Sequence, residues 1–101
     1  MNDIEIEKIK NLIPIGSIVR LSGIEKKVMI TGYIFDGKSD YLGVLWPIGD
    51  YSDEAKLGFN TNDVEKIFFR GYENLELEKL KNILLDTDET DNNKEDVVTN
   101  G

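Results

Sequence analysis

The sequence predicts an α+β protein that is mainly β, in which a five-stranded antiparallel sheet is flanked by two helices. Between residues 15 and 70, short runs of β-branched and aromatic residues alternate with Gly, Asp, Asn and Ser. On either side of that segment, apolar residues recur at helical spacing. The remaining stretch, residues 86–101, is acidic and has few apolar residues to bury. We therefore expect a single small domain over residues 1–85 and a disordered acidic tail over residues 86–101.

Composition narrows the classes of function. The 101 residues suffice for one modest core, and the absence of Cys and His removes disulfides, thiolate metal sites and the commonest general base. The net charge is −8, of which −5 falls on residues 86–101, and no basic stripe suited to phosphate backbones is present. No run approaches the roughly 20 apolar residues that a membrane span needs. We expect a soluble, cytoplasmic protein with no nucleic acid, no membrane insertion and no cofactor.

The first element in the chain is a short helix over residues 3–12. Ile6, Ile9 and Ile13 have the spacing of one helical face, and acidic residues at the start suit the positive end of the helix dipole. Pro14 cannot continue a helix and should end it. The sequence thus predicts an amphipathic helix of about three turns.

Five strands follow within about 55 residues, and they are expected at 17–21, 26–35, 41–46, 55–59 and 64–70. The intervening segments have the composition of tight turns. Short strands linked in this way predict a meander that closes into a small SH3-like barrel or remains a strongly coiled sheet. Gly32 and Gly43 lie in mid-strand, where glycine commonly marks a bulge or a bend.

A second helix is expected over residues 74–85. Leu77, Leu80 and Leu84 form one helical stripe, and Asn74 is a suitable N-cap. Its early acidic and later basic residues agree with the helix dipole. We expect this C-terminal helix to pack its leucines on the sheet.

Residues 32–39, "GYIFDGKS", match the P-loop pattern G-x-x-x-x-G-K-S. A working P-loop joins a strand to a helix whose first amides hold the phosphates. Here the residues between the glycines favour a strand, and the following "DYLGVLW" also alternates as a strand does. We interpret the segment as a β-hairpin in which Gly37 takes a positive φ, and we expect no nucleotide.

Other chemical signals are weak. Residues 86–97 begin like a calcium-binding loop, but Asp91 stands where glycine is needed and Val97 where a bidentate glutamate is needed. The serines have no histidine partner, and no nucleophile elbow is present. We therefore predict no metal site and no catalytic residue, so that the protein is not an enzyme.

Exposed aromatic residues remain as candidates for protein binding. Trp46 precedes Pro47, which must end the strand or make it an edge, so Trp46 either covers the end of the core or forms a partner-binding edge with Tyr51. Phe68 and Phe69 should point to opposite faces of one strand, one into the core and the other under the C-terminal helix or into solvent. The candidate partner-binding residues are Trp46, Pro47, Tyr51, Phe69 and Tyr72.

Three segments, which carry four motifs, together resemble a known family. "LIPIGSIVRLSGIEKKVMITGY", "DYLGVLWPIGD" and "FNTNDVEKIFFRGYENLEL" are similar to the domain-of-unknown-function family 4176, whose pattern runs L-P-x-G-S-V-V-x-L-x-G, K-K-x-M-I-x-G, D-Y-x-G-x-x-Y-P-x-G and F-N-x-x-D-I-x-x-V-x-x-x-G-Y. The resemblance spans about residues 12–75. The chain departs from the pattern in the extra Ile13 before the proline and in Trp46 where an aromatic, usually tyrosine, stands. The positions that fall on the pattern are Gly16, Ser17, Lys27, Met29, Gly32, Tyr41, Gly43, Pro47, Gly49, Phe59, Asn60, Asp63 and Gly71.

The resemblance implies a biological setting. Such proteins are typically encoded in Gram-positive bacteria beside type VII secretion genes and LXG-type toxins. It implies an adaptor or chaperone that binds such a toxin in the cytoplasm before export, or alternatively an immunity protein that occludes the active site of a toxin. The toxin could be bound through an edge strand of the sheet or through an aromatic rim, and both alternatives are open. The acidic tail is a candidate for electrostatic steering toward a basic toxin domain.

Overall fold

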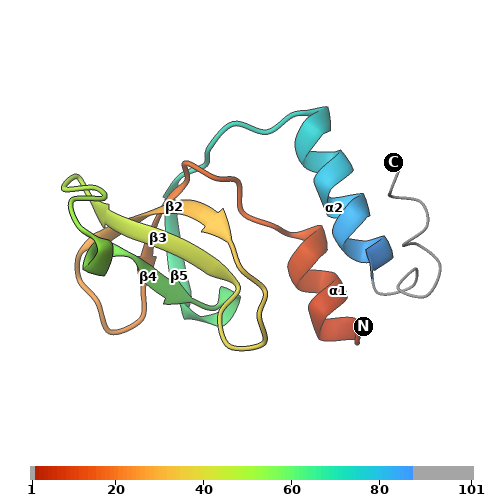
Figure 1. Cartoon of the computed structure of the whole chain (residues 1–101), viewed down its shortest axis with the longest axis horizontal. Coiled ribbons are helices and arrows are strands. Elements are labelled where there is room, and N and C mark those ends of the chain that lie inside the picture. The colour runs from red at the N-terminus through yellow and green to blue at the C-terminus, as the bar shows by residue number, and fades with distance from the viewer. Residues whose placement is uncertain (1, 88–101) are drawn as a thin grey trace. The chain divides into compact units, whose positions relative to one another are not determined.

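The computed structural model describes residues 2–87, which form two compact units (Figure 1). The helical unit comprises residues 2–12 and 73–87, and the sheet unit comprises residues 13–72. That residues 1–85 fold as one domain stays a prediction. The predicted tail falls mostly on residues 88–101, which lie outside the described part of the chain.

The helical unit consists of α1 (Asp3–Lys10) and α2 (Leu75–Thr87), which contact each other. The Asn2 side chain caps α1 by accepting a hydrogen bond from the Glu5 amide at 2.8 Å. Asn74 serves α2 in the same way, because its Oδ1 accepts from the Glu76 amide at 3.0 Å. Both predicted helices are therefore confirmed.

The bounds of the helices differ slightly from the predicted ones. α1 ends at Lys10, with Asn11 as its C-cap, before Pro14 is reached. α2 continues through Thr87, two residues past the predicted end, so Asp86 belongs to a helix rather than to the predicted tail. That α2 packs on the sheet stays a prediction.

The sheet unit contains all five predicted strands: β1 (Ile18–Leu21), β2 (Lys27–Tyr33), β3 (Tyr41–Trp46), β4 (Leu57–Phe59) and β5 (Val64–Phe69). Every pairing is antiparallel, and the strand order is β4-β3-β2-β1-β5. Two short 3₁₀ helices, η1 (Asp53–Ala55) and η2 (Thr61–Asp63), precede β4 and β5.

Of the two predicted forms of the sheet, the SH3-like barrel is wrong, because the five-stranded sheet is open. Closure would require β4 to pair with β5, but these strands are the two edges of the sheet. β4 has only three residues, and the link from β4 to β5 is η2 rather than a hairpin turn. The Asn60 and Asp63 side chains close η2 reciprocally as a capping box, which turns the chain away from a direct β4–β5 ladder.

Most of the core of the sheet unit lies on one face of the sheet, which we call the inner face; its buried side chains include Val19, Leu21, Val28, Ile30, Tyr41 and Phe59, whereas Val44, which pairs with Met29, is buried on the opposite face. The Tyr41 ring stacks on Phe59 with centroids 5.5 Å apart and meets Tyr33 edge-on at 5.8 Å. Burial of such side chains contributes about 1.5–3 kcal/mol each and is the main stabilising term of the unit.

The two mid-strand glycines have different roles. The register between β2 and β3 shifts between Ile30 and Gly32, which leaves Thr31 as the extra residue, so the bulge predicted near Gly32 is confirmed. At Gly43 a Cβ atom would lie 2.7 Å from the Met29 carbonyl oxygen and 2.8 Å from Val28 Cγ1. Gly43 is thus required by close packing of β3 on β2, whereas a Cβ atom on Gly32 would meet Leu42 Cβ at 4.0 Å, an ordinary van der Waals contact.

The P-loop-like segment is a β-hairpin, as predicted. β2 ends at Tyr33, and the chain turns through Gly37, whose φ is +92°, into β3 with no helix following. Asp36 Oδ1 accepts hydrogen bonds from the amides of Lys38 and Ser39, both at 2.9 Å. The carboxylate therefore occupies the amides that a phosphate would need.

Two hydrogen-bonded anchors fix the ends of the sheet unit. The Ile13 amide donates to the Tyr41 hydroxyl at 3.0 Å, and the Tyr33 hydroxyl donates to the Ile13 carbonyl at 2.8 Å. Near the other end, the Gly71 amide donates to the hydroxyl of the fully buried Ser17 at 2.8 Å. The chain therefore enters and leaves this unit at fixed points.

Candidate partner-binding surface

The face of the sheet opposite the core, which we call the outer face, is defined by strand register. Trp46 lies opposite Lys27, Lys27 opposite Arg20, and Arg20 opposite Lys66. Directly paired residues of antiparallel strands project to the same face, so these four side chains form one row across β3, β2, β1 and β5. Their sequence neighbours Val19 and Val28 are fully buried on the inner face, as the alternation of a strand requires.

Strand β5 carries two register shifts against β1. Ile18 pairs with Phe69 but Val19 pairs with Ile67, so Phe68 is an extra residue. Likewise Arg20 pairs with Lys66 but Leu21 pairs with Val64, which makes Glu65 extra. Extra residues of this kind are β-bulges, which re-aim side chains and interrupt the ladder of an edge strand.

The bulge corrects the prediction for Phe68 and Phe69. Strict alternation would bury one of them, but Phe68 is 41% exposed and Phe69 is 59% exposed. Because the bulge opposes both residues to a single partner position, neither enters the core. Two phenylalanines are therefore accessible where the sequence predicted at most one.

The side chains of two lysines lie against the Phe68 ring. The Nζ atoms of Lys27 and Lys66 each lie 5.0 Å from the centroid of the Phe68 ring, within the range of cation–π attraction. Because Lys27 and Lys66 project to the outer face, the Phe68 ring lies there as well. The outer face thus combines aromatic rings with basic groups.

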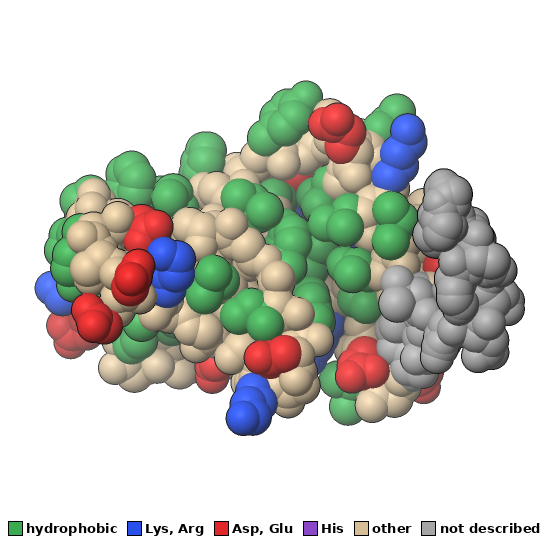
Figure 2. Space-filling view, viewed as in Figure 1, with side chains coloured by type: hydrophobic (Ala, Val, Ile, Leu, Met, Phe, Trp, Pro, Cys, Tyr) green, Lys and Arg blue, Asp and Glu red, His purple; other side chains and the backbone are tan. Residues whose placement is uncertain are grey.

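Trp46 extends this surface to β3. It is 45% exposed, so it is not a buried lid of the core, and its role in partner binding stays a prediction. Trp46 and Phe69 lie in different rows, three strands and two residues apart, which corresponds to roughly 15 Å. Hydrophobic side chains accordingly reach the surface of the sheet unit among charged ones (Figure 2).

The other predicted site residues are exposed but belong to loops. Pro47 follows Trp46 directly, and Tyr51 lies in the same connection between β3 and β4, with two thirds of its surface exposed. Tyr72 is 80% exposed and follows β5 after Gly71. The structure therefore brings Trp46 and Phe69 onto one face, whereas Pro47, Tyr51 and Tyr72 stand on connections that leave the sheet.

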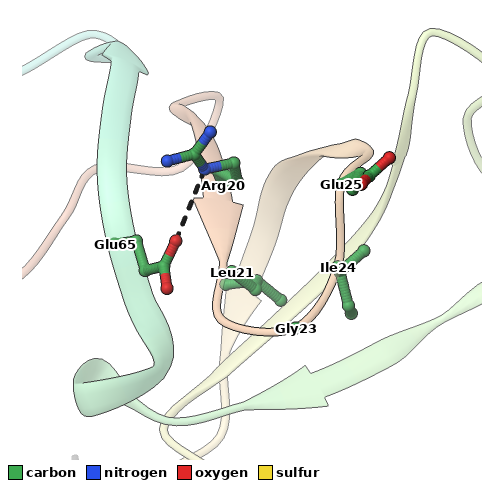
Figure 3. A pocket seen from close by; sticks show the side chains of 6 residues that line it. All are labelled: Arg20, Leu21, Gly23, Ile24, Glu25 and Glu65. Carbon is green, nitrogen blue, oxygen red and sulfur yellow. Dashed lines mark ion pairs between the residues drawn. The ribbon is translucent and has the colours of Figure 1, made fainter.

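A shallow depression of about 470 Å³ adjoins the basic row. Its lining comes from β1, the following turn and β5, and consists of Arg20, Leu21, Gly23, Ile24, Glu25 and Glu65 (Figure 3). Arg20 Nε lies 3.5 Å from Glu65 Oε1, and both side chains are about half exposed, so the pair contributes little to stability. The depression has carboxylates and one guanidinium but no nucleophile with an adjacent base.

The perturbed titratable groups are structural. Burial raises the pKa of the Tyr41 hydroxyl, against the smaller opposing effect of the Ile13 amide that it accepts. The amides of Ser39 and Lys38 lower the pKa of the exposed Asp36 carboxyl. Within residues 2–87, no three potential metal ligands of the His, Cys, Asp or Glu types gather in one place. None of the helices in this part of the chain is long and apolar enough to span a bilayer.

The partner-binding residues predicted from the sequence do not include Arg20, Lys27, Lys66 and Phe68. The basic residues lie far apart in the sequence and meet only through the register of β1 with its two neighbours. A cross-strand alignment of "VRL", "KKV" and "EKI" would have suggested the row, because each places a basic residue beside a strand-forming one. The bulge at Phe68 has no such signal, since no glycine marks it.

The fold and its surface define a small α+β protein whose open antiparallel sheet exposes an aromatic and basic face. The family model DUF4176, a domain of unknown function, matches residues 12–80, which is more than half of the chain. The chain belongs to this family, as the sequence pattern suggested. No curated protein and no solved structure matches it.

Most residues on the family pattern serve the fold. Gly16 and Gly49 have φ values of +92° and +83°, and a Cβ atom on Gly71 would overlap the Ile15 carbonyl oxygen. Tyr41 and Phe59 stack in the core, and Asn60 and Asp63 close η2. The pattern therefore records chain geometry at these positions.

Proposed function

We propose that the protein is a non-enzymatic adaptor or chaperone that binds a type VII-secreted, LXG-type toxin in the cytoplasm before export. The observation that carries the binding role is the exposure of Trp46, Phe68 and Phe69 on one face of the sheet. Exposed aromatic side chains on one surface are typical of protein-binding sites, where they act as anchors. The toxin as partner is supported by the resemblance to the family and by membership in it.

Of the two binding routes that the sequence leaves open, the outer face is favoured over an edge strand. An added partner strand needs a regular ladder of free backbone groups along an edge. The β4 edge is only three residues long, and the β5 edge is interrupted by two bulges. Both are features that oppose strand addition, so we assign recognition to side chains of the outer face.

The test is co-expression of the tagged full chain with LXG toxins from the same organism, each divided into its N-terminal LXG region and its C-terminal domain. We expect a stable complex with the LXG region, whose stoichiometry light scattering would give. The double variant Trp46→Ala/Phe69→Ala should lose the complex, because anchor residues contribute about 2 kcal/mol or more each. The matched control is Ile4→Ala/Leu75→Ala, which removes two exposed apolar side chains of the helical unit.

Each outcome of this experiment supports or refutes a particular role of the protein. Elution of the chain alone from every co-expression would refute the adaptor role. Equal loss of the complex in the control variant would move the contact away from the outer face. Retention by the C-terminal toxin domain, with loss of that domain's activity, would instead identify an immunity protein.

A further inference from the structure

Two ammonium groups converge on one aromatic ring of the outer face. Lys27 Nζ and Lys66 Nζ are each 5.0 Å from the Phe68 centroid, so the two nitrogens are at most about 10 Å apart. Arg20 stands between the two lysines in the strand register. Three cations therefore lie in one row, and the strand pairing itself holds them there.

The two lysines of this row lack the carboxylate partner that Lys56 and Lys81 have, as several other exposed lysines in the described part of the chain also do. Lys56 pairs with Asp50 at 3.0 Å and Lys81 pairs with Glu78 at 3.3 Å. Within residues 2–87, neither Lys27 nor Lys66 has a carboxylate oxygen within 4.0 Å, and the one carboxylate that joins the row, Glu65, is directed to Arg20. Like charges at this separation repel each other, because they lie within about one Debye length.

We propose that the outer face binds an acidic segment of a protein partner, whose carboxylates pair with Lys27 and Lys66 on either side of Phe68. This inference rests on the proposed protein-binding function and names the chemistry of the partner. The segment must supply the negative charges that complement the positive charges of the row. The Phe68 ring provides an apolar surface between the two ion pairs. Trp46 and Phe69 lie within the same face and take apolar side chains of that segment.

The size of the row limits the length of the segment. From β3 to β5 the row crosses three strand spacings, or roughly 14 Å. About four residues of an extended peptide cover that distance. A short acidic motif with one or two aromatic or aliphatic residues therefore fits.

A protein segment is favoured over nucleic acid by the charge of the whole chain. A polyanion would extend beyond three cations and meet a protein whose net charge is −8. A short peptide samples only the local potential of the row, since salt screens more distant charges beyond about 8–10 Å. Nucleic acid is accordingly the alternative that the experiment must exclude.

The test uses the full chain and a fluorescein-labelled heptapeptide in which glutamate alternates with Phe, Trp and Leu. Fluorescence anisotropy gives the Kd, and amide chemical shifts locate the contact. We expect binding that shifts the Lys27, Lys66 and Phe68 amides and weakens as salt rises from about 0.05 to 0.5 M. The same peptide with glutamine in place of glutamate should bind at least about tenfold more weakly.

Charge-removing variants separate the row from the rest of the surface. Lys27→Gln/Lys66→Gln should weaken peptide binding about tenfold and abolish most of its salt dependence. The control Lys38→Gln/Lys56→Gln removes the same charge from the hairpin and from the β3–β4 connection, and it should leave Kd unchanged. All four lysines are exposed, so both variants are expected to fold, which circular dichroism checks.

The outcomes are distinct from those of the toxin experiment. Equal Kd for the glutamate and glutamine peptides, or equal weakening in the two double variants, overturns the acidic-segment site. Tighter binding of a dT12 oligonucleotide than of the peptide assigns the row to nucleic acid and also overturns it. A toxin complex that persists in Lys27→Gln/Lys66→Gln refutes this site but leaves the proposed function standing. Peptide binding without any toxin complex supports this site but refutes the proposed toxin-binding function.

Discussion

The anchor at Ile13 yields the sharpest stability prediction. In Tyr41→Phe the ring and its stack on Phe59 remain, but the hydroxyl that accepts the Ile13 amide is lost. Because this hydrogen bond is buried, the amide is left without a partner at a cost of about 1–3 kcal/mol. That is a substantial part of the roughly 5–15 kcal/mol that stabilises a typical domain.

Urea unfolding followed by fluorescence of Trp46, the single tryptophan, reports on the sheet unit. With an m value of about 1–2 kcal/mol/M, the midpoint should fall by roughly 1–2 M at unchanged m. Tyr33→Phe is the matched control, because it removes a hydroxyl donor to the Ile13 carbonyl, and Tyr33 is only partly buried. This hydrogen bond is only partly buried, so water can replace the lost hydroxyl and the loss of stability should be under about 1 kcal/mol.

The same residue gives a pH dependence with a definite sign. Burial raises the pKa of Tyr41 above the unfolded value of about 10, so above that pH the unfolded chain releases a proton that the folded chain retains. The contribution of Tyr41 is therefore complete below about pH 10 and declines as pH rises through the folded pKa. The stability difference between wild type and Tyr41→Phe should narrow in that range. Equal midpoints for wild type and Tyr41→Phe at pH 7, or a larger loss in Tyr33→Phe, would refute this account of the anchor.

Three further predictions concern the sheet unit. Gly43→Ala should destabilise it by about 2–3 kcal/mol, because the new Cβ meets the Met29 carbonyl, whereas Gly32→Ala should cost less than about 1 kcal/mol; similar urea midpoints for the two would contradict the packing argument. Asp40→Ala should cost about 2–3 kcal/mol, since Asp40 Oδ2 accepts both the Thr61 amide and hydroxyl at 2.9 and 2.7 Å, and Asp40→Asn should recover part of this loss in the same assay. In carbon-detected NMR, the Asp36 carboxyl should show a pKa below that of ordinary aspartates, and the amide chemical shifts of Lys38 and Ser39 should follow its titration. The stabilisation of the hairpin by Asp36 is therefore present above an ordinary carboxyl pKa and is lost as pH falls through the lowered pKa. Titration of these amides independently of Asp36 would argue against this role of the carboxylate.

Local composition sufficed for the elements of the fold. The β-branched runs located all five strands within a few residues, and Asn74 and Pro14 marked where helices begin or cannot continue. Gly37 predicted the hairpin because only a residue without Cβ adopts its positive φ freely. These signals act over a few residues, so a sequence displays them directly.

The closure of the sheet and much of the candidate site depended on contacts between distant strands. Whether β4 pairs with β5 depends on the path through η2, and "NTND" is compatible with a hairpin turn as well as with a capping box. Phe68 and Phe69 were assigned to opposite faces because alternation holds only for a regular strand, and the bulge arises from pairing with β1. Pro47 alone indicates that Trp46 lies at the end of a strand, whereas the basic row becomes visible only from the register of β1 with β2 and with β5.

The hydrogen bond between Ser17 and Gly71 brings the start and the end of the sheet unit together. Gly71 lies against the backbone of Ile15 and Gly16, and it is tied to Ser17, although more than 50 residues separate them. A module whose ends adjoin can be spliced into a loop of another protein with little disturbance of the host. Residues 13–72 are therefore the segment that we expect to be graftable as one cassette. Grafting this cassette into a host loop would also provide a carrier in which the outer face can be studied apart from the helical unit.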